Sequence, residues 1–296
     1  MKITDIFPTL GDLRLYADGL QADTTLQQLT PSIRTTAMEM GKIITKATFE
    51  AIAAGGEYTV PLKEGETGEP KKINVDEATE LLKTALASGA LYRYQIFAST
   101  KRNGSDAALY KYQHEEIKDS YIEGYWKAMD ALLDWLDSHA DIGGYGSTID
   151  YEDRQTLPIK NADEFERYFG IGRSSFFFSK ILYIIRDTWK GIYSRIRNHE
   201  DDTAVMEAAK KALCYIVIAK VVKRFDLTEF PRSIRFDYNH EYSKGSSTAS
   251  RDTLSADLMA EANATMAEMG QLLRRGSEDS PLANTNQESD KFFFSI

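Results

Sequence analysis

The chain has 296 residues, of which 42% are hydrophobic, 11% aromatic and 27% charged, a composition that excludes a disordered or fibrous protein. Its 45 acidic residues outnumber 36 basic ones and give a net charge of −9, which argues against a protein that coats nucleic acid. The single cysteine, Cys214, excludes a disulfide scaffold.

The N-terminal sequence contains no basic segment followed by an apolar one and no cysteine for a lipid anchor. We therefore expect a cytoplasmic protein. The longest apolar run, residues 212–219, is closed by Lys220 and is too short to span a bilayer. It is typical of a buried helix, so we expect no membrane partner.

Helical spacing of apolar residues dominates the first half of the chain. Thr9 is placed to cap a short helix, and Thr30-Pro31 to open a longer one that runs to about residue 52. Further helices are expected from residue 76 and over residues 110–136. Between them, residues 94–100 lead into Asn103-Gly104, a dipeptide typical of hairpin turns, which predicts a short β-ribbon.

The second half shows the same order of elements. Asn161 or Asp163 is placed to cap a short helix. Long helices are expected over residues 174–197, 203–225 and 254–273, and Gly276 is expected to end the last one. Residues 232–238 alternate in hydrophobicity before Lys244-Gly245, which predicts a second ribbon.

Three weakly similar blocks recur in the same order in the two halves. They are residues 33–37 and 185–189, 82–86 and 209–213, and 129–133 and 269–273. The first half carries an extra segment rich in Gly, Pro and charge over residues 53–76, which should project as a loop or hairpin. A mainly α fold of two tandem, related helical-bundle units is predicted. The units are residues 1–140 and 157–276, joined by a linker (141–156) and followed by a polar tail (277–296).

Motifs for catalysis and metal binding are missing from the sequence. It has no P-loop, no nucleophile elbow and no His-Glu-x-x-His, and none of the four histidines pairs with another at ligand spacing. Cys214 lies in an apolar run and is interpreted as a core residue rather than a nucleophile. We therefore expect no catalytic, metal or cofactor site.

Three polar patterns have a functional and a structural interpretation. Asp130, Asp134 and Asp137 share a helix face, but di-metal bundles also need Glu-x-x-His motifs, so a solvated acidic stripe is favoured. Residues 170–174 would suit a phosphate at a helix start, although a plain helix start is favoured. Residues 200–202 precede a helix and are expected to complement its dipole rather than bind calcium.

Aromatic residues give the strongest signal for an interaction. Phe176, Phe177 and Phe178 span about 200° of a helix, so some of them must meet a second surface, either the other unit or another subunit. The polar tail ends in an apolar segment with Phe292, Phe294 and Ile296 in alternation, as on one face of a strand. We expect this segment to add to a ribbon edge at residues 96–101 or 232–238, in the same subunit or a neighbour; a frayed terminus is the alternative. The candidate protein-interaction residues are Phe176, Phe177, Phe178, Phe292, Phe293, Phe294 and Ile296.

Six segments spread over most of the chain share a pattern with a known family. They are residues 29–37 (LTPSIRTTA), 85–94 (ALASGALYRY), 112–116 (YQHEE), 128–133 (AMDALL), 174–178 (SSFFF) and 291–294 (KFFF). In these segments the chain resembles uncharacterised proteins of bacteriophages and prophages of gut bacteria, regarded as virion or head–tail connector components. The shared motifs are structural, so the resemblance implies no active-site residue.

The resemblance implies a non-catalytic virion assembly protein, a head–tail connector or neck adaptor subunit. Its partners would be further copies of itself in a ring and virion proteins such as a portal or tail-completion protein. It would reside in the host cytoplasm during assembly and then in the virion. An acidic protein suits a channel through which DNA slides, without sequence-specific binding. The duplication departs from the usual single-bundle connector, and a helical enzyme or ligand-binding protein with an unrecognised pocket is the alternative.

Overall fold

The computed structural model describes residues 6–17, 20, 24–62, 65, 67–102, 111–226, 229–231, 233–234 and 247–278. The structure is 74% helical, and the sheet formed by its described residues is a single two-stranded ribbon. The fold is therefore mainly α, as predicted. No helix in these ranges combines the length and apolar character needed to cross a membrane.

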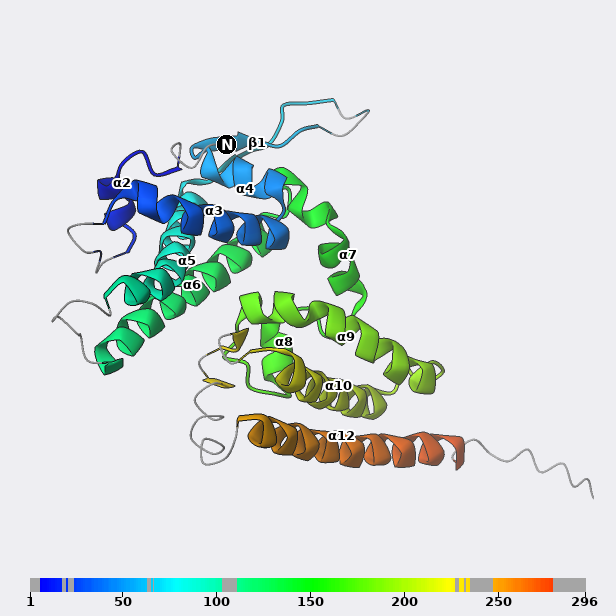
Figure 1. Ribbon diagram of the computed structural model, residues 1–296. Coiled ribbons are helices and arrows are strands. Elements are labelled where there is room, and N and C mark those ends of the chain that lie inside the picture. Colours follow the sequence, from blue (N-terminus) through cyan, green and yellow to red (C-terminus); the bar gives the residue numbers. More distant parts are fainter. Residues whose placement is uncertain are drawn as a thin grey trace, which may run out of the picture.

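The first half of the chain forms a helical bundle, coloured blue to teal in Figure 1. Its elements are α2 (Leu10–Arg14), α3 (Leu26–Ile43), α4 (Lys46–Ala53), β1 (Glu57–Thr59), β2 (Lys72–Asn74), α5 (Asp76–Arg102) and α6 (Lys111–Ser138). Helix α5 packs against both α3 and α6. The antiparallel β1–β2 ribbon lies within the segment expected to form a loop or hairpin.

The second half forms another bundle beside the first (Figure 1). Its elements are α8 (Ala162–Glu166), α9 (Ser175–Ile196), α10 (Thr203–Arg224) and α12 (Ser247–Glu278). Helix α10 packs against both α9 and α12, as α5 does against α3 and α6. The long helices thus pack in the same order in both halves, whereas α4 and the β1–β2 ribbon have no counterpart among the described residues of the second half. The origin of the halves in a duplication stays a prediction.

Several expected boundaries are wrong for local reasons. Helix α3 starts at Leu26, because Thr25 and Gln28 form a capping box that precedes Pro31. The helix α5 continues through the segment expected to form a strand at residues 94–100, because it packs along α6. Gly276 does not end α12, which runs to Glu278. The expected ribbon at residues 232–238 lies largely outside the described residues.

The segment expected to be a linker is itself folded. It forms a short 3-10 helix, η1 (Ile142–Ser147), and then α7 (Ile149–Thr156). Gly143 presses against α4, and its amide donates a hydrogen bond to the Tyr58 hydroxyl at 3.2 Å. The buried apolar side chains of both bundles form one continuous cluster. The two halves are therefore packed together and not merely tethered.

Two neighbouring glycines in η1 provide a matched test of this packing. Both have positive φ, but a Cβ on Gly143 would lie 2.4 Å from the Thr48 Cα, whereas one on Gly144 would meet nothing within 4 Å. Gly143→Ala is predicted to lower the free energy of unfolding by about 2–4 kcal/mol, and Gly144→Ala by about 1 kcal/mol. Urea denaturation measures both values. Equal losses would show that η1 does not press on α4.

Candidate functional site

The two bundles meet where the first turn of α9 lies against α6. Ser174 is the N-cap of α9, and its hydroxyl accepts a hydrogen bond from the Phe177 amide at 3.1 Å. The same hydroxyl donates to Asp130 Oδ1 at 2.7 Å, and the Phe176 amide donates to that oxygen at 2.8 Å. A carboxylate of one bundle therefore caps the first long helix of the other, where the helix dipole favours negative charge.

Asp130 is held in an environment that opposes its charge. Burial raises the pKa of its carboxyl group to about 6, and the hydrogen bonds from Phe176 and Ser174 offset only part of this effect. Nearby Asp134 raises the pKa further by charge repulsion. Desolvation of the carboxylate is thus the energetic cost of this contact.

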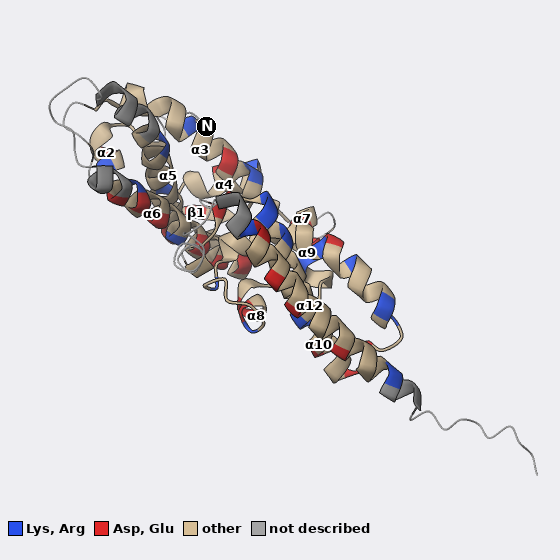
Figure 2. Cartoon of the chain, turned by 60° about the horizontal axis from the view of Figure 1, so that its bottom comes forward, with Lys and Arg blue, Asp and Glu red and all other residues tan. Residues whose placement is uncertain are grey.

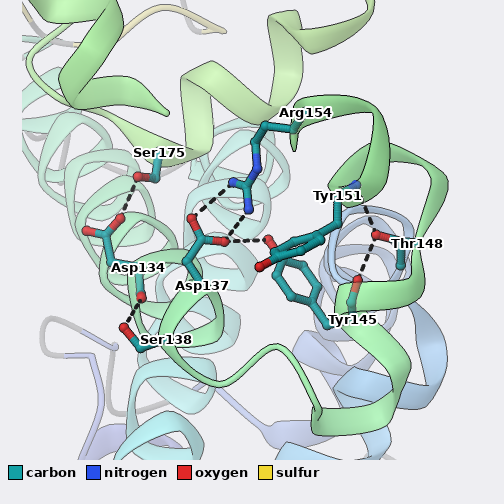
Figure 3. Close-up of polar contacts among 8 residues, drawn as sticks. All are labelled: Asp134, Asp137, Ser138, Tyr145, Thr148, Tyr151, Arg154 and Ser175. Atoms are coloured by element: carbon teal, nitrogen blue, oxygen red, sulfur yellow. Dashed lines mark hydrogen bonds and ion pairs between the residues drawn. The ribbon is translucent and has the colours of Figure 1, made fainter. Parts of the chain in front are cut away.

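The other two aspartates of the same face also reach the second half of the chain (Figure 3). Asp134 accepts a hydrogen bond from the Ser175 hydroxyl at 2.5 Å. Asp137 forms a bidentate pair with Arg154 of α7, with N···O distances of 2.6 and 3.0 Å. The Tyr145 hydroxyl donates to Asp137 as well, at 3.3 Å. Such fork-to-fork pairs fix orientation as well as charge.

Helix α7 connects α6 to α9. Arg154 is only 13% exposed, and its guanidinium lies over the ring of Tyr151, 4.9 Å from the centroid. On the same helix, Asp153 forms an ion pair with Arg186 of α9. Two adjacent residues of α7 therefore bond to different bundles, Arg154 to α6 and Asp153 to α9.

The expectation of a solvated acidic stripe on α6 is wrong for Asp130 and Asp137, which are partly buried, whereas Asp134 is exposed. All three side chains bond across the junction, so the stripe forms its polar half. The spacing showed that the three carboxylates share one face, but nothing local showed that α9 would dock there.

The three consecutive phenylalanines of α9 are all buried and meet different neighbours. Phe176 packs edge-on against Tyr125 and Trp126 of α6, in the other half of the chain. Phe178 contacts Phe165 of α8, within its own half. Phe177 lies between Trp126 and Phe230. The second surface expected from their spacing is therefore the first bundle, and in this conformation the three rings are not exposed to a partner.

A cleft of about 400 Å³ opens above this junction. Its lining residues come from α3, α5, α6, α9 and the segment after α10: Glu39, Lys42, Ile43, Tyr92, Arg93, Ile122, Tyr125, Trp126, Phe176, Lys180 and Glu229. Aromatic rings from α6 and α9 form the apolar part of the lining, and both signs of charge surround it. This combination is typical of a binding site, because apolar surface supplies affinity and a few polar groups fix orientation.

The charges of the cleft are held in pairs. Arg93 of α5 pairs with Glu39 of α3. Lys180 of α9 pairs with Glu229 at 2.9 Å, and its ammonium also lies 5.8 Å from the Trp126 ring centroid. Burial is the main cause that raises the pKa of the Tyr125 hydroxyl, and Glu39 adds to the effect. Sequence reasoning missed this cleft, and only the phenylalanine run signalled that two surfaces meet here.

The remaining sequence candidates have structural roles where they are described. The amides of Ile171 and Arg173 donate to Glu166 Oε2 at 2.7 and 3.0 Å, so a carboxylate occupies the position that a phosphate would take. Asp202 caps α10, which agrees with the dipole interpretation of residues 200–202. Cys214 is buried, and burial raises the pKa of its thiol.

Two further points concern metals and the tail. Within the described part of the chain, no group of three or more potential ligands is placed to hold a metal ion. The tail candidates Phe292, Phe293, Phe294 and Ile296 lie outside the described residues. Their predicted interaction with a ribbon edge cannot use residues 96–101, which belong to α5.

Comparison with known proteins gives one match. Residues 190–292 match the model of a family of unknown function (DUF6712), which covers less than half of the chain. The matched segment contains the last turns of α9, then α10, α12 and the tail as far as Phe292. No curated protein and no solved structure matches the chain.

Substitutions at Asp130 test the cap of α9. Asp130→Ala is predicted to lower the free energy of unfolding by about 1–2 kcal/mol, because two donors at the helix start lose their acceptor. Asp134→Ala is the matched control, since Asp134 accepts only from a side chain at the same junction, and should cost about 0.5 kcal/mol or less. Chemical denaturation at neutral pH measures both. Equal effects would contradict a capping role for Asp130.

The pH dependence of the same site has a definite sign. A folded-state pKa of about 6, against an ordinary pKa of 3.8 for an aspartate side chain, means that the folded protein binds the proton more tightly than the unfolded chain. As the pH falls from 7 to 4, wild type should gain about 2 kcal/mol relative to Asp130→Asn, which does not titrate there. A stability difference that does not change with pH would contradict the burial of the charge.

Proposed function

We propose that the chain is a non-catalytic structural subunit of a phage or prophage particle, acting as a head–tail connector or neck adaptor. The observation that carries this proposal is the use of acidic side chains at the junction. Asp130, Asp134 and Asp137 all bond to groups that hold the second half in place. Side chains of the types that often perform acid–base chemistry are thus engaged in joining two helical bundles.

The sequence and the charge distribution support the same proposal. Segments from both bundles resemble proteins of phages and prophages, and the motifs in that resemblance are structural. The net charge is −9, and Figure 2 shows acidic and basic residues interspersed along the helices. Such a surface suits contact with other proteins around passing DNA better than tight binding to the phosphate backbone.

The partners under this proposal are further copies of the chain and the virion proteins on either side of it. A portal would lie on the head side and a tail-completion protein on the tail side. Subunits of a ring meet head to tail through two different surfaces, so each copy must carry two complementary patches. Its location would be the host cytoplasm during assembly and then the finished particle.

Disruption of the gene in an inducible prophage tests the function. We expect DNA-filled heads and free tails without joined particles, because a missing connector blocks their union and leaves each part able to assemble. Electron microscopy of the lysate shows the outcome, and complementation from a plasmid is the control. Normal yields of infectious, tailed particles from the disrupted prophage would contradict the proposal.

A further inference from the structure

The cleft above the junction lacks an occupant from the described part of the chain, although its lining suits an apolar group. Phe176 packs edge-on against both Tyr125 and Trp126, and the small exposed parts of these three buried rings form its aromatic part. Ile43 and Tyr92 are only partly buried and lie in the same lining. Aromatic rings inserted there would gain both apolar burial and edge-to-face contacts.

The sequence supplies a matching apolar segment in the tail after α12. Residues 279–291 contain one large apolar residue, Leu282, and they are followed by Phe292, Phe293, Phe294 and Ile296. These four side chains would form a sticky patch in water. The match to the family of unknown function continues through the tail to Phe292, so most of the tail belongs to the segment that the family shares.

Charge is also complementary between the tail and the cleft. The tail carries Glu288, Asp290 and Lys291 before its aromatic residues, so the acidic side chains outnumber the basic one there. The cleft carries Lys42, an exposed residue of α3, whereas Arg93 and Lys180 in the same lining are already paired with Glu39 and Glu229. An acidic segment that approaches this rim would be attracted to it and would place the following rings toward the aromatic lining.

The position of α12 indicates which copy provides the tail. The N-terminal part of α12 lies by the cleft, because Arg251 pairs with Asp226 and the cleft residue Glu229 follows closely in the chain. The tail leaves from Glu278, at the other end, about 40 Å away at 1.5 Å per helical residue. The 14 residues from there to Phe292 span at most roughly 46–50 Å. A tail that returned to its own cleft would have to be almost fully stretched.

We propose that the cleft binds the aromatic tail segment, residues 288–296, of a second copy of the chain. The contact joins two different surfaces and is therefore heterologous, so repetition builds a closed ring or an open filament. For the tail of another copy the length of α12 sets no such minimum span, so binding does not require an extended tail with its larger ordering cost. This inference does not rest on the proposed function, because it concerns self-association alone.

Sedimentation of the full-length protein over a range of concentrations tests the contact. Wild type is expected to show a mass that increases with concentration. Two variants should weaken self-association at least about 100-fold: the triple variant Phe292→Ser/Phe293→Ser/Phe294→Ser, and Ile43→Asp in the cleft. Leu15→Ser, at a 79% exposed apolar residue on the end of α2, is the control and should behave as wild type.

Mixing the two weakened variants distinguishes a second copy from the same chain. The tail variant keeps an intact cleft and the cleft variant keeps an intact tail, so an equimolar mixture should form a 1:1 dimer that grows no further. Circular dichroism checks that Ile43→Asp retains its helices; if it does not, Tyr92→Ser takes its place. A wild type that is monomeric at all concentrations would overturn the inference, and so would a mixture without dimer. The sedimentation results and the gene-disruption results are independent, so either proposal can fail without the other.

Discussion

The capping of α9 by Asp130 is the contact on which the arrangement of the two halves depends. A helix start exposes amide groups that lack intrahelical partners, and burial against another bundle would leave them unsatisfied. Ser174 accepts from one of these amides and Asp130 from another. Because the acceptor comes from α6, the helix start can be buried only where α6 supplies it. The hydrogen bonds to Asp130 thus fix one position of α9 along α6, whereas apolar packing alone would allow the two helices to slide past each other.

The cleft follows from this placement. Capping by Asp130 brings Phe176 against Trp126 and Tyr125, and one turn later Lys180 reaches over the Trp126 ring. The cleft therefore exists in this form only when the two bundles are docked. The cost is the desolvation of the Asp130 carboxylate, which its two hydrogen bonds and the surrounding aromatic contacts offset.

The sequence predicted the elements better than their contacts. Helices α9 and α10 begin where expected because Ser174 and Asp202 are strong caps, which act locally. The strand expected at residues 94–100 was wrong because packing along α6 overrides the local preference for a ribbon. The acidic stripe was misread for a related reason: its spacing defines a face, but the helix that covers this face is more than 40 residues away in the chain. The cleft draws on α3, α5, α6 and α9, and only the run of phenylalanines indicated that two surfaces would meet.

Polar contacts from α6 are expected to make the two helical bundles into one cooperative body, and differential scanning calorimetry tests this cooperativity most directly. Wild type should unfold in a single transition whose calorimetric and van't Hoff enthalpies agree. The variant Asp130→Ala/Asp134→Ala/Asp137→Ala should unfold in two separate transitions, because each bundle keeps most of its own core. Two transitions in wild type, or a single unshifted transition in the triple variant, would contradict the claim.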